Sequence, residues 1–401
     1  MTDRPILYAT QIDISLPNGP GVNEREFVAA FARMYGPRAR FVLAEPRDRS
    51  VLEGLGHVRT FRVAPSRAMH VFSELAFLRA LLRESRQTRP VLVVARSGAL
   101  PLALVAFPHQ AKVPVALKTY GEATLKYLCD QPSWKGWVAR RIRGVNMRLA
   151  DSLLGSAMAV DCCTEQLVRR NIEHHPSVDA SKFFHVDNAT NVDRFKPARS
   201  EDARKALGLE RFEQLVGYAG GVPWERGAVE MIHGVALLAG KFPRLGCVVI
   251  GGSGQPLEAL KQLADRLGIG DRCLVLGQIP YEQVPRWVAA FDVGVALDLD
   301  ERMSYVGSSN QKIRQYLASG KPVIATAGAN LFLEQEGLGY TARRGDYDGI
   351  ARIIEALLLR PASAIEAEAV RARDYAVREL SIQSAIRKRV ARWIAQLGSE
   401  L

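Results

Sequence analysis

Short apolar runs alternate along the chain with segments whose apolar residues recur every three or four positions. In the first half, strands are expected at residues 5–10, 40–44, 59–64, 90–95 and 113–118. Helical spacing occurs at residues 24–35 and at residues 66–86, where Phe72 and Leu75 are expected on the buried face. This alternation predicts a parallel, doubly wound sheet flanked by helices.

The same alternation restarts in the second half of the chain. Strands are expected at residues 214–219, 247–250, 323–325 and near 339–341. A final amphipathic helix is expected at residues 381–397. Because 401 residues exceed the usual size of one hydrophobic core, we expect an α/β protein with two Rossmann-like doubly wound domains.

Residues 307–326 are typical of a loop, a helix, a helix stop and a short strand. Ser308, Ser309 and Asn310 are candidate N-caps at the front of this helix. Unpaired backbone N–H groups and the positive end of the helix dipole make such a front an anion site, best suited to phosphate. The alternative is the ordinary helix N-terminus of any α/β protein.

Glycine-containing turns follow several of the expected strands. They contain Gly19 and Gly21, Gly220 and Gly221, and Gly252. A turn without side chains lets the backbone approach a ligand phosphate closely. The first of these turns lacks the spacing of a dinucleotide-binding fingerprint, and an ordinary βα turn is its alternative.

Charged and polar residues also follow the expected strands. Arg96 and Lys118 each end a strand, and Tyr120 comes shortly after the second. Ligands of doubly wound sheets bind at the carboxyl ends of the strands, so these residues are expected to line the ligand-binding edge. The acidic loop at 298–306 is a candidate for a divalent ion, for acceptor contact or for simple solvation.

Positive charge is concentrated in the first half of the chain. The formal net charge is +12. Residues 1–197 hold 28 Lys and Arg against 18 Asp and Glu (28 − 18 = +10), and residues 198–401 hold 26 against 24 (26 − 24 = +2). This asymmetry favours an anionic partner such as nucleic acid, anionic lipid or a phosphorylated acceptor.

The segment 133–149 combines Trp134 and Trp137 with five basic residues. A basic helix with tryptophans suits the surface of an anionic membrane. The alternative is a solvated helix whose tryptophans belong to the core. No apolar run approaches the roughly 20 residues that span a bilayer, and the start lacks a signal peptide's apolar core, so a cytoplasmic location is expected.

The five cysteines are scattered and contain no C-x-x-C pair. Cys162 and Cys163 are adjacent and are expected on a helix. Structural thiols are therefore expected in place of disulfides or a metal site. The chain also has no recognisable nucleic-acid-binding module.

The segment Ala318-Ser-Gly-Lys-Pro-Val-Ile-Ala325 carries a family resemblance. It is similar to the second half of the nucleotide-sugar-binding helix of GT-B glycosyltransferases, especially the retaining family GT4. In that family two glutamates, separated by seven residues, precede the segment. Gly307 and Gln315 stand at their positions here.

Further segments resemble the same family in the same order along the chain. Residues 150–156 are similar to a strand element of the first domain, and residues 184–197 to the signature that closes it. Arg226 stands where the family has a diphosphate-binding lysine, and Gly221 where it has an arginine. Tyr120 takes the place of the family's histidine.

The resemblance implies the domains and the site. It implies an N-terminal acceptor-side domain at 1–197, a nucleotide-sugar-binding domain at 198–375, and a helix at 376–401 that crosses back to the first domain. Catalytic positions would be Tyr120, Arg226 and Gly307. Donor-binding positions would be Gly19, Gly21, Gly220, Gly221, Arg226, Gly252, Ile279, Ser308, Ser309, Asn310, Lys312 and Gln315. For Lys312, a solvent-facing position on the helix is an equal alternative.

These observations predict a glycosyltransferase that moves a sugar from a nucleotide-sugar to a glycan or lipid-linked acceptor, in bacterial surface polysaccharide synthesis. The family implies retention of anomeric configuration and no bound metal or other cofactor. The protein would be cytoplasmic, or peripheral on the inner face of the membrane. The alternatives are an inactive GT-B partner or scaffold, favoured by the missing glutamates, and a nucleotide-sugar epimerase.

Overall fold

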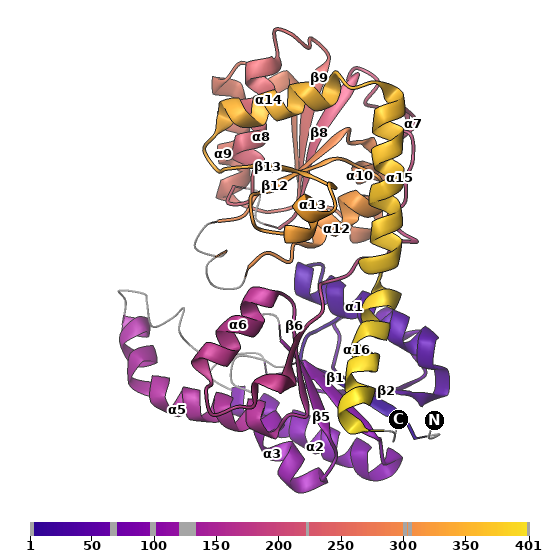
Figure 1. The fold of residues 1–401 in the computed structure, drawn as a ribbon, viewed down its shortest axis with the longest axis vertical. Helices are drawn as coiled ribbons and strands as arrows, with labels where there is room; N and C mark the ends of the chain where they lie inside the picture. The colour runs from indigo at the N-terminus through magenta and orange to yellow at the C-terminus, as the bar shows by residue number, and fades with distance from the viewer. Residues whose placement is uncertain are drawn as a thin grey trace. The chain divides into compact units, whose positions relative to one another are not determined.

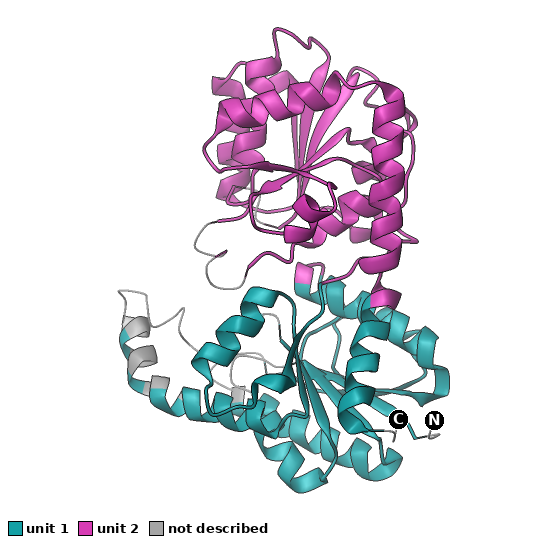
Figure 2. Ribbon diagram, viewed as in Figure 1, with its two compact units in different colours: residues 1–16, 20–187, 385–401 teal, residues 17–19, 188–384 magenta. Residues whose placement is uncertain are grey.

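The computed structural model describes residues 4–64, 70–96, 102–119, 134–221, 224–299, 303 and 307–398. The chain divides into two compact units (Figure 2). Unit 1 consists of Met1–Leu16, Pro20–Asp187 and Ala385–Leu401, and unit 2 of Pro17–Gly19 and Asn188–Ser384. The boundary expected after residue 197 lies inside unit 2, and the segment expected to start at residue 376 joins unit 1 from Ala385 onward.

Unit 1 is built on a seven-stranded sheet in the order β3-β2-β1-β4-β5-β6-β7. Its strands are β1 (Ile6–Thr10), β2 (Ala39–Ala44), β3 (His57–Phe61), β4 (Leu92–Arg96), β5 (Val115–Thr119), β6 (Ala159–Cys162) and β7 (Phe183–His185). All neighbouring strands pair in parallel, as expected for a doubly wound sheet. The order reverses between β1 and β4, so their carboxyl ends flank the topological switch point.

Helices cover the sheet of unit 1. They are α1 (Gly19–Tyr35), α2 (His70–Thr88), α3 (Leu102–Ala111), α5 (Trp134–Ser156), α6 (Glu165–His174) and α16 (Ile382–Leu397), of which the last joins this unit from Ala385. Helices α2, α3 and α5 lie together along the sheet (Figure 1). Phe77, Phe107 and Leu153 of these helices share one buried core with the strands.

The strand expected at residues 150–156 is wrong. Helix α5 continues to Ser156, and the next strand is β6. Ala150, Leu153 and Leu154 are buried at positions i, i+3 and i+4, which is helical spacing. Cys162 ends the next strand, β6, instead of lying on a helix.

The apolar face expected for residues 66–86 is also partly wrong. Helix α2 buries Phe77 and Leu81, but 64% of Phe72 and 43% of Leu75 remain exposed. Both lie in the first turns of α2, whereas its later turns contact β2 and β3. The amphipathic pattern of the first turns thus leaves apolar side chains on the surface.

Unit 2 contains a six-stranded sheet in the order β10-β9-β8-β11-β12-β13. Its strands are β8 (Gln214–Ala219), β9 (Leu245–Ile250), β10 (Cys273–Gly277), β11 (Val293–Ala296), β12 (Val323–Thr326) and β13 (Tyr340–Ala342). All pair in parallel, which confirms the second doubly wound sheet.

Helices cover both faces of the second sheet. They are α7 (Ser200–Ala206), α8 (Ala228–Leu238), α9 (Gln255–Arg266), α10 (Val284–Ala290), α12 (Gln311–Ala318), α13 (Leu331–Gln335), α14 (Tyr347–Leu358) and α15 (Ala362–Glu379). Helices α8, α9 and α14 bury one core against the sheet. Helices α10, α12 and α15 bury the other.

Candidate functional site

The donor-binding residues expected in unit 2 follow the carboxyl ends of adjacent strands. Gly220 and Gly221 follow β8, Gly252 follows β9, Ile279 follows β10, and the loop before α12 follows β11. These four strands are neighbours in the sheet. The prediction from sequence spacing therefore corresponds to one edge of one sheet, where ligands of doubly wound sheets bind.

The glycine turns at this edge are packed against one another. The Gly220 amide donates to the Ile250 carbonyl at 2.8 Å, and the Gly251 amide donates to the Gly277 carbonyl at 2.6 Å. Gly251 and Gly252 have φ values of +97° and +82°, a region that side chains rarely adopt. A Cβ on Gly251 would also clash with the Gly220 carbonyl oxygen. Glycine is thus required here by backbone geometry.

Arg226 is held at the start of α12 by two side chains. Its Nη1 donates to Asp298 Oδ1 at 2.8 Å and to Asn310 Oδ1 at 2.7 Å. Asn310 Nδ2 donates in turn to Asp298 Oδ2 at 2.6 Å, which closes a triangle. The structure therefore places the predicted diphosphate-binding arginine beside the predicted anion-binding helix.

Lys312 lies in the first turn of α12 and is buried, so the solvent-facing alternative is excluded. Its ammonium nitrogen lies 4.6 Å from the centre of the Tyr218 ring, a cation–π contact. A Cβ on Gly220 would lie only 2.7 Å from Lys312 Cε. Gly220 therefore makes room for the lysine, and a second cation lies near the front of the helix.

The loop before α12 is held in place by hydrogen bonds within unit 2. Asn330 Nδ2 donates to Ser308 Oγ at 3.0 Å, and Asn188 Nδ2 donates to the Ser309 carbonyl at 2.9 Å. Asn310 occupies the N-cap position of α12, but its side chain makes no capping hydrogen bond. The asparagine side chain binds Arg226 and Asp298 instead.

The positions of the two family glutamates have different surroundings. Gly307 has φ of +71°, so the backbone there favours glycine over glutamate. Gln315 is buried on α12. The next residue toward the N-terminus, Arg314, is fully buried and donates to the carbonyls of Asn188 at 2.7 Å and Asn310 at 2.9 Å. Arg314 thus joins the 184–197 signature to α12.

Two further predicted site residues lie in the first turn of α1. Gly19 begins α1, and Gly21 follows it in the first turn, where a Cβ would clash with the Leu16 carbonyl oxygen. Tyr120 lies outside the described residues. No described contact therefore assigns it a role.

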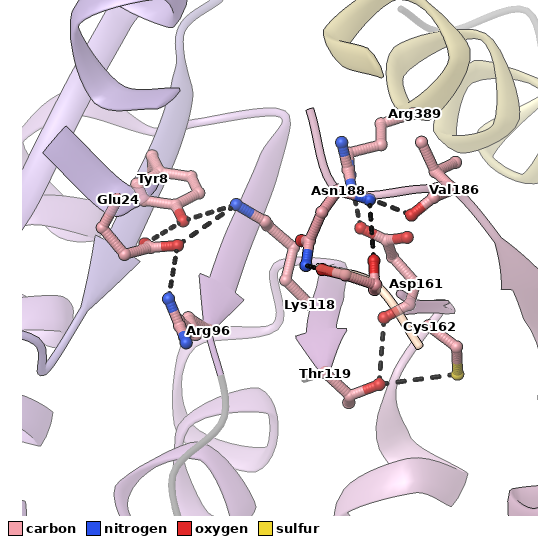
Figure 3. Close-up of polar contacts among 11 residues, drawn as sticks. Tyr8, Glu24, Arg96, Lys118, Thr119, Asp161, Cys162, Val186, Asn188 and Arg389 are labelled. Atoms are coloured by element: carbon pink, nitrogen blue, oxygen red, sulfur yellow. Dashed lines mark hydrogen bonds and ion pairs between the residues drawn. The ribbon is translucent and has the colours of Figure 1, made fainter. Parts of the chain in front are cut away.

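A buried polar cluster lies at the carboxyl ends of β4 and β5 in unit 1 (Figure 3). Lys118 Nζ is 3.0 Å from Tyr8 Oη and 3.4 Å from Glu24 Oε1. Arg96 Nη1 donates to Glu24 Oε1 at 2.9 Å, and Tyr8 donates to the other oxygen of Glu24. Arg96 and Lys118 thus occupy the sheet edge where the sequence placed them, around a carboxylate from α1.

Burial and charge shift the pKa values of this cluster. Burial lowers the pKa of Lys118 to about 7, although Glu24 opposes the shift. For Glu24, burial raises the pKa, but the charges of Lys118 and Arg96 and the hydrogen bonds outweigh it, and the pKa falls to about 2. Glu24 is therefore ionised at neutral pH and is the central anion of the cluster.

A second buried ion pair joins α16 to β6 within unit 1. Arg389 of α16 donates through Nε to Asp161 Oδ2 and through Nη2 to the Val186 carbonyl at 3.2 Å (Figure 3). Both side chains are buried. The final helix is thus attached to unit 1 by a charge pair as well as by apolar contacts.

Sequence reasoning did not assign Glu24, Asp161, Arg314 or Arg389 to any site, and it placed Asp298 only in a loop that was a candidate for a divalent ion or for acceptor contact. The sequence held a weak signal for Asp298 and Asp161. Each is a charged residue at the end of an apolar strand run, where burying a charge without a partner costs free energy. Their partners lie far away in sequence, so spacing alone does not identify them.

Three further features concern membrane-spanning helices, metal sites and the cysteines. Within the described parts of the chain, no helix combines the length and apolar character needed to cross a bilayer. No cluster of three or more His, Cys, Asp or Glu side chains suited to a metal ion occurs among the described residues. The cysteines that the structure describes, Cys162, Cys163, Cys247 and Cys273, are free thiols.

Comparison with known sequences identifies a family model and several relatives. Residues 213–360 match the family model of glycosyl transferases group 1. A D-inositol 3-phosphate glycosyltransferase of Streptomyces scabiei is 29% identical over 45% of this chain and 42% of its own length. A lipopolysaccharide core biosynthesis mannosyltransferase of Rhizobium meliloti is 30% identical over 33% of this chain and 37% of its own. The chain thus spans less than half the length of these relatives.

Comparison with solved structures covers nearly the whole chain. The crystal structure of Anabaena HepE in complex with UDP aligns with a TM-score of 0.71 over 98% of this chain and 99% of that one. The sequences are 20% identical, so the likeness shows a shared fold. The resemblance read from the sequence is confirmed: residues 213–360 match the family model of glycosyl transferases group 1, and the chain has the GT-B fold.

Proposed function

We propose that this protein transfers a glycosyl group from a nucleoside-diphosphate sugar to an acceptor. The observation that carries the proposal is the pair of cations, Arg226 and Lys312, at the front of α12. Glycosyl transfer breaks the bond between the anomeric carbon and a diphosphate oxygen, and negative charge grows on the leaving group. Fixed cations and backbone N–H groups at the diphosphate stabilise that charge.

Different residues at this edge of unit 2 would bind different parts of the donor. Arg226, Lys312 and the amides of Ser308, Ser309 and Asn310 would bind the diphosphate. Gln315 would hydrogen bond the ribose, and the backbone near Gly252 and Ile279 would meet the nucleobase.

In the same proposal, Gly307 would contact the sugar through its backbone. Gly19 and Gly21 would let the backbone approach the donor closely, and Gly220 and Gly221 would do the same for the diphosphate. Tyr120 would lie near the reacting sugar. Because the two cations supply the positive charge, the transfer needs no bound metal, and we infer retention of anomeric configuration from the family.

The nucleotide we would try first is UDP, because HepE has the same fold and was crystallised with it. The test is a thermal-shift titration of the purified chain with UDP, GDP, ADP, dTDP and CMP and their sugars. A nucleotide that binds the folded protein raises its melting temperature. A response to one nucleotide supports the proposal and fixes the donor class, whereas no response to any of them contradicts it.

The acceptor we propose is a glycan or a lipid-linked glycan in surface polysaccharide synthesis. A lipopolysaccharide core mannosyltransferase among the relatives supports this class of acceptor. Unit 1 also exposes apolar side chains beside basic ones: Phe72 is 64%, Trp137 56% and Val145 61% exposed. The Arg141 guanidinium lies 5.2 Å from the Trp137 ring centre. Such a surface suits peripheral binding to an anionic membrane on its cytoplasmic face.

A second candidate function is a catalytically inactive partner of the same fold. The observations that favour it are Gly307, whose positive φ disfavours a glutamate, and the uncharged Gln315. The same titration separates the two functions, because an inactive partner without a donor site gives no nucleotide response. The two cations near the front of α12, Arg226 and the buried Lys312, favour the transferase.

A further inference from the structure

The acidic residue that begins the loop after β11 is built into the interior of unit 2. Asp298 is fully buried, and both of its carboxylate oxygens accept hydrogen bonds, from Arg226 at 2.8 Å and from Asn310 at 2.6 Å. Its own amide donates to Thr326 Oγ1 at 2.8 Å. The carboxylate therefore has a fixed place, set by β12 on one side and α12 on the other.

The loop that carries Arg226 is attached to the same point. The Leu297 amide donates to the Arg226 carbonyl at 3.1 Å, so the backbone of the arginine is tied to the residue before Asp298. Arg226 is thus held at both its backbone and its side chain by the end of β11.

The contacts of the guanidinium are confined to one nitrogen. Both of its hydrogen bonds to described side chains run through Nη1. Arg226 Nε is buried and has no hydrogen-bond partner among the described residues. Nε and Nη2 form the side-on edge of a guanidinium, and their two parallel N–H groups match two oxygens of one phosphate or carboxylate.

We propose that Asp298 is a positioning residue for the donor diphosphate. By holding Nη1, it directs the Nε–Nη2 edge of Arg226 toward the phosphate oxygens and keeps it there before the donor arrives. Through the second oxygen it also sets Asn310, and with it the first amides of α12. This inference rests on the proposed function, because it names how that donor site is organised.

A carboxylate beside a diphosphate site weakens the long-range electrostatic attraction of that site for an anion. Asp298 can therefore favour diphosphate binding only by holding the hydrogen-bond donors in the right positions. Preorganised donors need no rearrangement when charge develops. A buried arginine without a counter-ion would carry a large desolvation cost, which Asp298 also removes. The experiment must therefore separate positioning from simple support of the fold.

The test compares UDP with uridine on three proteins: wild type, Asp298→Asn and Asp298→Ala. The measurement is the dissociation constant by calorimetry, at a temperature where circular dichroism shows each protein folded. If another nucleotide responds in the panel, that diphosphate and its nucleoside replace UDP and uridine. Asparagine keeps the shape of the side chain but has one acceptor oxygen for two donors, so it holds either Arg226 or Asn310.

We expect Asp298→Asn to weaken UDP binding about tenfold or more and to leave uridine binding unchanged. Asp292→Asn is the matched control, because Asp292 flanks the opposite end of β11 and pairs with Arg204 at 2.7 Å. That control is expected to bind UDP and uridine as the wild type does.

Three outcomes would overturn the inference. Unchanged or tighter UDP binding by Asp298→Asn would make Asp298 a counter-ion only. Equal weakening of UDP and uridine would make it a support of the fold. A folded wild type that binds no nucleoside diphosphate would contradict the proposed function itself, and the inference with it.

Discussion

At the scale of single residues, the proposed donor site depends on pairings between distant parts of the chain. Arg226 and Asn310 were expected at the site, but their partner Asp298 was not, because no spacing rule joins positions 72 residues apart. From its position on the helix alone, Lys312 could be exposed to solvent or buried. The structure shows that Gly220, which has no side chain, leaves space for the buried side chain of Lys312.

Arg226→Ala should weaken binding of the responding nucleoside diphosphate by about a hundredfold, because it removes a charge-assisted fork and leaves Asp298 as an unpaired buried anion nearby. Nucleoside binding should change little. Calorimetry measures both constants, and Arg244→Ala, which removes an exposed arginine paired with Glu213, is the control. Unchanged diphosphate affinity in Arg226→Ala would remove the arginine from the site.

Lys118 gives a prediction about pH. Its pKa is about 7 in the folded protein against 10.5 for an unburied lysine. Between these values the unfolded chain binds the extra proton, so the free energy of unfolding should rise with pH. Lys118→Met should lose this rise. The charged groups around the lysine are Glu24, Arg389, Arg96 and Asp161.

The measurement is urea unfolding at a series of pH values from 7 to 10. The exposed lysine Lys261 provides the control, since Lys261→Met removes a lysine with half of its side chain in solvent. Identical pH profiles for wild type and Lys118→Met would contradict the assigned shift. Glu24 contributes in the opposite range: its lowered pKa of about 2 means that stability is lost as pH falls from 4.5.

At the scale of elements, alternation of apolar runs and helical segments was enough to predict both parallel sheets. It failed at residues 150–156, where the same short apolar run fits a strand or the end of a long helix. Length decides in favour of the helix, because the amphipathic segment before it is continuous. The prediction of the buried face of α2 was partly wrong for a similar reason, because the spacing of apolar residues does not show where a helix leaves the sheet.

The exposed apolar side chains Phe72 of α2 and Trp137 of α5 should bind anionic vesicles. The variant Phe72→Ser with Trp137→Ser should lower the vesicle-bound fraction several-fold, because it removes the side chains available for insertion. Sedimentation with vesicles of phosphatidylglycerol at low and high salt measures it. The double variant Leu276→Ser with Leu331→Ser, which changes exposed leucines of unit 2, is the control.

Equal binding by both double variants would locate the membrane contact elsewhere. Absence of binding by the wild type at low salt would remove the membrane from the proposal. Neither outcome bears on the donor site, since these side chains belong to unit 1.

At the scale of the whole molecule, the family match lies within unit 2, and the fold likeness covers nearly the entire chain. The sequence predicted the elements of unit 2 more completely because its motifs are local: a glycine turn, a helix front and the strand after it. In unit 1, Glu24 pairs with Lys118 across 94 positions, and Asp161 pairs with Arg389 across 228 positions, which no local pattern predicts.

The last helix should matter for the stability of unit 1. Arg389→Met leaves Asp161 as a buried carboxylate without its partner, and loss of one member of a buried pair costs about 3 kcal/mol. Thermal unfolding of Arg389→Met should show a lower transition temperature for unit 1. Lys388→Met, at the neighbouring exposed position, should leave that transition temperature unchanged. A melting profile equal to that of the wild type would show that the pair contributes no net stability.

The most direct test of the central claim is release of nucleoside diphosphate from a nucleotide sugar. Wild-type protein is incubated with UDP-glucose, and then with the other nucleotide sugars, in the presence of membrane extract as a source of acceptor. We predict UDP or another diphosphate to appear with wild type and Arg244→Ala, and at least a hundredfold less with Arg226→Ala. No release from any donor by folded wild-type protein would contradict the account and favour the inactive partner.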